Sequence, residues 1–196
     1  MIKTRTEKKS KDKAFNLIIS GYGGQGVLMI ADVVANAALK QGFDVKEAEL
    51  HGLAQRGGSL ECHVRFGRKI DSPVILRGAA DLIIALEACE ALRACYWANE
   101  STNILLNKKS FNIPFSPEQL AEKIKKVSKK IQAVDADAIV EKLTNDIVSV
   151  NIYMLGLAVK KGLLPLKKEN IWKAISEKTG ERFLQENKKV FEAAFK

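Results

Sequence analysis

Residues 14–26 read AFNLIISGYGGQG, and this stretch decides the fold. The run 14–20 is apolar and lies between charged residues and glycines, which predicts a fully buried strand. From Gln25 onward, apolar residues recur three and four positions apart, which predicts a helix that ends at Gly42. A second strand is predicted at 43–49. Strand, glycine turn, helix and strand form a βαβ unit, for which topology predicts parallel pairing of the two strands.

The segment 59–66 alternates strictly between apolar and polar residues, which predicts a half-buried strand. Residues 70–75 are predicted to return beside it as a hairpin partner, and Pro73 would confine that partner to an edge. Further strands are predicted at 81–86, 102–107 and 130–134, with helices through residue 99, at 117–129 and from residue 137 to the end. These elements predict an α/β protein with a three-layer α/β/α, Rossmann-like fold. Its sheet is expected to be mostly parallel with an antiparallel hairpin edge, and helices are expected at the C-terminus.

The length of 196 residues suits one compact domain, which we expect at 14–196 behind a basic tail at 1–13. The net charge of +9 is uneven: residues 1–13 sum to +4 and residues 14–117 sum to zero, so the remaining excess lies further on. Solvated helix faces or docking to an acidic partner chain therefore explain the charge better than nucleic-acid binding. No apolar run approaches a membrane span, and no apolar segment follows the first residues. We expect a cytoplasmic protein without membrane contact.

The cysteines argue against metal chemistry on this chain. Cys62, Cys89 and Cys95 are an odd number and form no C-x-x-C pair, which excludes a disulfide framework, a zinc ribbon and an iron–sulfur cluster held by this chain alone. We expect buried, inert thiols and no metal site. No Gly-Asp dipeptide, G-x-x-x-x-G-K-[ST] loop, G-x-S-x-G elbow or H-E-x-x-H helix occurs either. A self-contained hydrolase or metalloenzyme is therefore not expected.

The glycine loop at 20–26 has the spacing G-x-G-x-x-G between a predicted strand and a predicted helix. Bare backbone N–H groups there can point, with the helix N-terminus, at a phosphate or another anion. The candidate anion-binding residues are Gly21, Gly23, Gly24, Gln25 and Gly26. Tight packing of helix on strand alone would also require glycines here. Glu47 or Glu49 lies where a dinucleotide-binding protein keeps its ribose-binding carboxylate, so an NAD-dependent dehydrogenase stays an alternative.

A second motif, HGLAQRGGS, occupies residues 51–59 directly after the second predicted strand. In an open α/β sheet such a loop lies at the carboxyl ends of the strands, where ligands bind. The candidate residues facing a substrate or partner are His51, Gly52, Gln55, Arg56, Gly57 and Gly58. An exposed connector with accidental polar residues is the alternative. His63 lies on the polar face of the alternating strand, and we interpret it as structural.

These two loops carry a resemblance to a known family. The run GYGGQG to VRFG, residues 21–67, resembles the gamma domain of 2-oxoacid:ferredoxin oxidoreductases. The form HG-x-AQRGG is similar to the beta subunit of the indolepyruvate ferredoxin oxidoreductases within that family. The likeness covers about residues 15–195 and continues through DSPVI at 71–75, GAADLIIALE at 78–87, EALR at 90–93 and NIYMLGLAVKKGLLPL at 151–166.

The resemblance implies a subunit that carries no electrons itself, in a complex that decarboxylates arylpyruvates such as indolepyruvate oxidatively to aryl-acetyl-CoA and reduces ferredoxin. Thiamine diphosphate, magnesium and 4Fe-4S clusters would belong to a larger alpha subunit, so this chain would hold no cofactor alone and no catalytic residue. Coenzyme A phosphates would lie at the glycine loop, and the second loop would face the partner's active site. The apolar stripe 152–163 has the helical spacing of a core or an interface. A large apolar interface would bind the partner, and this stripe is its candidate. The alternatives are a gamma subunit of a pyruvate or branched-chain 2-oxoacid ferredoxin oxidoreductase, and a non-catalytic nucleotide-binding adaptor module.

Overall fold

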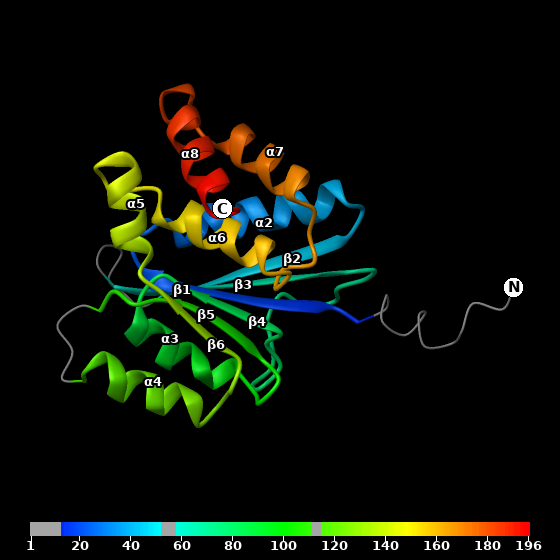
Figure 1. The fold of residues 1–196 in the computed structure, drawn as a ribbon. Helices are drawn as coiled ribbons and strands as arrows, with labels where there is room; N and C mark the ends of the chain where they lie inside the picture. Colours follow the sequence, from blue (N-terminus) through cyan, green and yellow to red (C-terminus); the bar gives the residue numbers. More distant parts are fainter. Residues whose placement is uncertain (1–12, 52–57, 111–114) are drawn as a thin grey trace, which may run out of the picture.

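A computed structural model describes residues 13–51, 58–110 and 115–196. Within these ranges six strands form one sheet in the order β2-β3-β1-β4-β5-β6 (Figure 1). The strands are β1 (Phe15–Tyr22), β2 (Asp44–His51), β3 (Ser59–Gly67), β4 (Leu82–Ala85), β5 (Asn103–Asn107) and β6 (Ile131–Val134). β1, β4, β5 and β6 run parallel, whereas β3 is antiparallel to both β1 and β2.

Helices cover both faces of this sheet (Figure 1). One face carries α2 (Val27–Lys40), α5 (Ala136–Thr144), α6 (Val150–Lys160), α7 (Lys168–Lys178) and α8 (Glu181–Ala193). The other face carries α3 (Ala88–Ala94), the 3₁₀ turn η1 (Cys95–Trp97) and α4 (Pro117–Lys125). The expected α/β fold, with its mixed sheet, antiparallel edge and C-terminal helices, is confirmed. No helix in the described part of the chain is long and apolar enough to cross a membrane.

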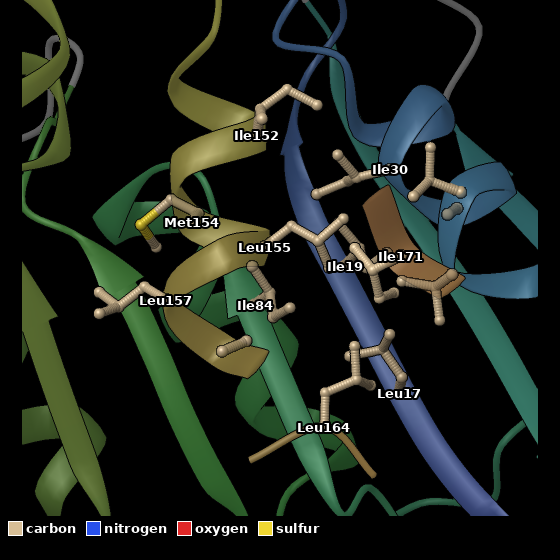
Figure 2. Packing of buried hydrophobic residues seen from close by; sticks show 14 of the residues in the cluster. Leu17, Ile19, Ile30, Ile84, Ile152, Met154, Leu155, Leu157, Leu164 and Ile171 are labelled. Carbon is tan, nitrogen blue, oxygen red and sulfur yellow. The ribbon is translucent and has the colours of Figure 1, made fainter. Parts of the chain in front are cut away.

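The apolar run of β1 is explained by its two buried faces. Leu17 and Ile19 point into the core shared with α2 and α6, whereas Ile18 between them joins the core beneath α3. A strand covered on both faces therefore shows no alternation of apolar and polar residues. Figure 2 shows the first of these cores, where Ile152 and Leu155 of α6 lie against β1 and β4.

The predicted partner interface on α6 is wrong. Ile152 and Leu155 are fully buried inside this chain, because α6 packs against the strands β4 and β5 and against the helices α2, α5 and α8. A helix that is apolar on all sides belongs in a core rather than on a surface. The stripe on α6 therefore belongs to this chain's own core.

Two predicted strand pairings are also wrong. β1 and β2 are not neighbours, because β3 lies between them and pairs with both. β2 contains Lys46, Glu47 and Glu49, charges that suit an edge strand better than a central one. Residues 70–75 form no strand, since both edges of β3 are already occupied. Instead, the Ile75 N–H donates to Nδ1 of His63 at 3.0 Å, which gives that buried histidine the structural role we predicted.

Candidate functional site

The glycine loop and the end of the second motif meet at the carboxyl edge of the sheet. Tyr22 and Ser59 are the last paired residues of β1 and β3, and just beyond them the Gly23 N–H donates to the Gly58 carbonyl oxygen at 3.0 Å. His51 is exposed at the end of β2, opposite Leu60 of β3. Gly52, Gln55, Arg56 and Gly57 lie outside the described residues. The described end of the second motif therefore lies beside the glycine loop, as expected for two loops at the carboxyl ends of the strands.

The glycines of the first loop are required for two different structural reasons, positive φ angles and close packing. Gly24 and Gly26 have φ values of 102° and 77°, in the region that side chains rarely adopt. Gly21 is required by packing instead, because a Cβ there would lie 2.7 Å from Oε1 of Gln25 and 2.9 Å from Cγ2 of Val27. The same Gln25 Oε1 accepts the Tyr22 N–H at 2.7 Å. Tight packing thus explains Gly21, whereas backbone conformation explains Gly24 and Gly26.

Three helix N-termini converge beside this loop. A cavity of about 290 Å³ is bounded by Gly26, Ser149 and Gly180, the N-cap residues of α2, α6 and α8. Within the described chain none of these N-caps gives its helix a side-chain hydrogen bond, and the first turns of α2 and α6 carry no acidic residue. α8 carries Glu181 in its first turn. Partial positive charges of helix N-termini favour an anion. Lys178 also lines the cavity, and its Nζ is paired with Oδ2 of Asp32 at 2.7 Å.

Asn151 is a site residue that the sequence analysis missed. Its side chain is 6% exposed, and its Nδ2 donates to the Gly26 carbonyl oxygen at 3.3 Å. Asn151 therefore fixes the glycine loop to the start of α6. The sequence signal for Asn151 was weak, because asparagine is common in the first turn of a helix, where its side chain bonds to nearby backbone groups.

A buried polar network continues along the cavity wall from α6 to α8. Ser149 Oγ lies 2.7 Å from Oδ1 of Asn187, and Asn187 Nδ2 donates to Thr179 Oγ1 at 3.1 Å. Ser149 and Asn187 are buried. These bonds fix the positions of the α6 and α8 N-termini that bound the cavity.

Carboxylates lie beneath the glycine loop on the α3 side of the sheet. Glu87 and Glu90 are both buried after the end of β4. The pKa of the Tyr22 hydroxyl is raised, first by burial and then by the charges of Glu87 and Glu90. This side of the loop is therefore acidic.

The geometry does not support a dinucleotide site. In a dinucleotide-binding fold the strand with the ribose-binding carboxylate is the next neighbour of β1. Here β3 separates β1 from β2, so Glu47 and Glu49 stand two strands, or about 9–10 Å, away. Among the described residues there is no group of three or more His, Cys, Asp or Glu that could hold a metal. Burial raises the pKa of Cys62 to about 12 and that of Cys95 to about 11, so both thiols are unreactive.

Comparison with known proteins defines the class. Residues 16–196 match the model of the pyruvate ferredoxin/flavodoxin oxidoreductase family, and the chain belongs to this family. The indolepyruvate oxidoreductase subunit IorB of Archaeoglobus fulgidus is 34% identical to it over 190 residues, which cover 92% of this chain and 93% of that subunit.

Other relatives belong to complexes for different 2-oxoacids. The common gamma subunit of the pyruvate/ketoisovalerate oxidoreductases of Thermococcus kodakarensis is 27% identical, over 89% of this chain and 92% of that subunit. The fold matches the crystal structure of the pyruvate oxidoreductase subunit PORC of Thermotoga maritima, with a TM-score of 0.72, 22% identity and coverage of 94% and 96%. The family expected from the two loops is therefore confirmed.

Proposed function

We propose that this chain is the subunit without electron carriers in a ferredoxin-dependent 2-oxoacid oxidoreductase that converts arylpyruvates such as indolepyruvate to aryl-acetyl-CoA. One observation carries the proposal: the two loops that resemble this family are joined by the hydrogen bond between Gly23 and Gly58 at the carboxyl edge of the sheet. The identity to IorB subunits supports the indolepyruvate complex in particular.

The carboxyl edge is the face we assign to a larger partner subunit. Half of the large apolar residues that are exposed in the described chain surround this edge, and they are Leu28, Leu50, Ile147, Val148 and Phe183. Exposed apolar side chains gathered at one edge are typical of a protein interface. In the proposed complex this partner holds thiamine diphosphate, magnesium and 4Fe-4S clusters. The thiamine diphosphate would supply the carbanion chemistry of decarboxylation, and the clusters would pass electrons to ferredoxin.

This chain then contributes binding and orientation. Coenzyme A phosphates would lie at Gly21, Gly23, Gly24, Gln25 and Gly26. The cavity beside this loop supports that role, because the N-cap residues of α2, α6 and α8 bound it. Within the second loop, Arg56 would bind a carboxylate or phosphate bidentately, with Gln55 beside it. No residue of this chain is assigned a catalytic role.

The proposal also covers the organisation of the chain. Residues 14–196 would act as one gamma-type domain behind the basic tail 1–13. The complex would work in the cytoplasm with ferredoxin, and neither nucleic acid nor a membrane would be a partner.

The first test is anaerobic purification of the chain with whatever larger protein accompanies it, followed by a substrate comparison. Dye reduction with indolepyruvate, pyruvate and 2-oxoisovalerate, with and without coenzyme A, should favour indolepyruvate and require coenzyme A. A preference for pyruvate or 2-oxoisovalerate would instead establish the second candidate, a gamma subunit like the T. kodakarensis relative. A solitary, colourless chain that binds nucleotides would establish the adaptor module and overturn the proposal.

A second test probes the second loop in the active complex. Gln55→Ala with Arg56→Ala should preserve folding and lower turnover at least about tenfold, because a bidentate anion contact is lost. Arg68→Ala is the control, since this exposed arginine lies just beyond the opposite end of β3. Unchanged turnover in the double variant would contradict the role assigned to Arg56.

A further inference from the structure

Glu90 is a buried carboxylate that the proposed function leaves unexplained. It belongs to the EALR segment, lies in the first turn of α3, and is only 2% exposed. Ser59 Oγ donates to its Oε2. Among the described residues, no group donates a hydrogen bond to its Oε1, which lies 3.4 Å from Nε of Arg93, whose side chain is largely exposed. Within the described residues, Oε2 of Glu90 therefore accepts a hydrogen bond, whereas Oε1 has only a longer ionic contact with Arg93.

The contacts of Glu90 come from both functional loops. Ser59 is the residue that follows the second motif, and Tyr22, whose side chain also hydrogen-bonds to Glu90, belongs to the glycine loop. Tyr22 and Ser59 face each other as the final pair of β1 and β3. The next residues outward are Gly23 and Gly58, which are hydrogen-bonded to each other. Glu90 thus lies beneath the junction of the two loops and contacts a residue on each side of it.

The fold itself does not need a charge at this position. Burial raises the pKa of Glu90, and the charge of Glu87 raises it further, whereas Ser59, Arg93 and Tyr22 lower it. Because the pKa is higher in the folded than in the unfolded chain, ionisation of Glu90 lowers stability as the pH rises through that value. A buried carboxylate that weakens the fold points to a functional requirement.

We propose that Glu90 is a positioning residue that holds Tyr22 and Ser59, and through them both motif loops, in the arrangement that coenzyme A and the partner subunit meet. The inference rests on the function proposed above for these loops. A carboxylate can accept hydrogen bonds from both hydroxyl groups at once. A neutral amide of the same shape carries no charge, so its oxygen would accept weaker hydrogen bonds from these hydroxyl groups than the carboxylate does.

The direct test compares Glu90→Gln with the wild type in the full chain, using amide hydrogen exchange at Gly23. Loss of one charged acceptor is expected to speed this exchange about tenfold. Glu61→Gln is the matched control, because Glu61 lies two residues after Ser59 on the same sheet face but bonds to Trp97 and His63 instead. It should leave the exchange at Gly23 unchanged. Equal exchange in Glu90→Gln and Glu61→Gln would overturn the proposal.

Two further readouts separate positioning from a general folding role. Glu90→Gln should not lower the melting temperature at pH 7, because the neutral amide removes a buried charge. Ser59→Ala should speed exchange at Gly23 as Glu90→Gln does, and combining the two should add little. A lower melting temperature for Glu90→Gln, or independent and additive effects on the exchange rate, would show that Glu90 only supports the fold.

In the active complex, Glu90→Gln should raise the KM for coenzyme A about tenfold and leave the KM for the 2-oxoacid unchanged. An equal rise in the KM values for coenzyme A and for the 2-oxoacid would contradict the proposal that Glu90 positions the coenzyme A loop. If the wild-type complex shows no coenzyme A-dependent activity, the proposed function fails. The exchange experiment still decides whether Glu90 holds the two loops, so the two failures are distinguishable.

Discussion

Gly26→Ala is the substitution whose effect follows most directly from the geometry of the glycine loop. Gly26 has a φ of 77°, and an L-residue held in this left-handed region loses about 1–2 kcal/mol. An added Cβ would also lie 2.2 Å from Nδ2 of Asn151, so that amide must move and lose its bond to the Gly26 carbonyl oxygen. Breaking a buried hydrogen bond adds about 1–3 kcal/mol. Together these two contributions predict that Gly26→Ala lowers the free energy of unfolding by about 2–5 kcal/mol.

Gly24→Ala separates these two contributions. Gly24 also has a positive φ, 102°, but a Cβ there would meet no heavy atom of the described residues within 4 Å. This variant should lose only the backbone contribution of about 1–2 kcal/mol. Urea unfolding at constant pH measures both free energies of unfolding, and equal m-values would confirm that the compared states are the same.

Asn151→Ala provides the decisive background for this comparison. Without the Asn151 amide, a methyl group at position 26 has space. In the Asn151→Ala background, Gly26→Ala should therefore lower the free energy of unfolding by no more than Gly24→Ala does. The difference between the two backgrounds is the coupling energy of residues 26 and 151. If Gly26→Ala and Gly24→Ala are equally destabilising in the wild-type background, the close contact with Asn151 is refuted.

The remaining predictions concern core packing and thiol reactivity. Gly156→Ala should lower the free energy of unfolding, measured by thermal unfolding, by about 1–2 kcal/mol, because an added Cβ would lie 2.9 Å from Cβ of Ala194. The gain in helix propensity offsets only about 1 kcal/mol of this strain. A variant more stable than the wild type would contradict this prediction. At pH 8, Cys62 and Cys95, with pKa values raised to about 12 and about 11, carry only about one thiolate in ten thousand and one in a thousand. Iodoacetamide should therefore label the partly exposed Cys89 first. Faster labelling of Cys62 than of Cys89 in the folded chain would contradict the burial of Cys62.

Local patterns in the sequence were sufficient to predict the secondary-structure elements and to find the two motif loops. The apolar run before the glycine loop, the helical repeat after it and the alternation in 59–66 each reflect the surroundings of one element. For this reason they predicted β1, α2 and β3 and the α/β class correctly. The resemblance added the family, because it rests on residues close together in the chain.

Only the tertiary structure decided which strands are neighbours and which residues share the site. Nothing local in the sequence places β3 between β1 and β2, because pairing depends on the free edges that the other strands leave. The same holds for Asn151, which reaches Gly26 across 125 positions, and for Glu90, which meets Ser59 across 31. The sequence by itself determined what each segment becomes. Contacts between distant segments, set by packing of the whole chain, decided what the carboxyl edge of the sheet contains.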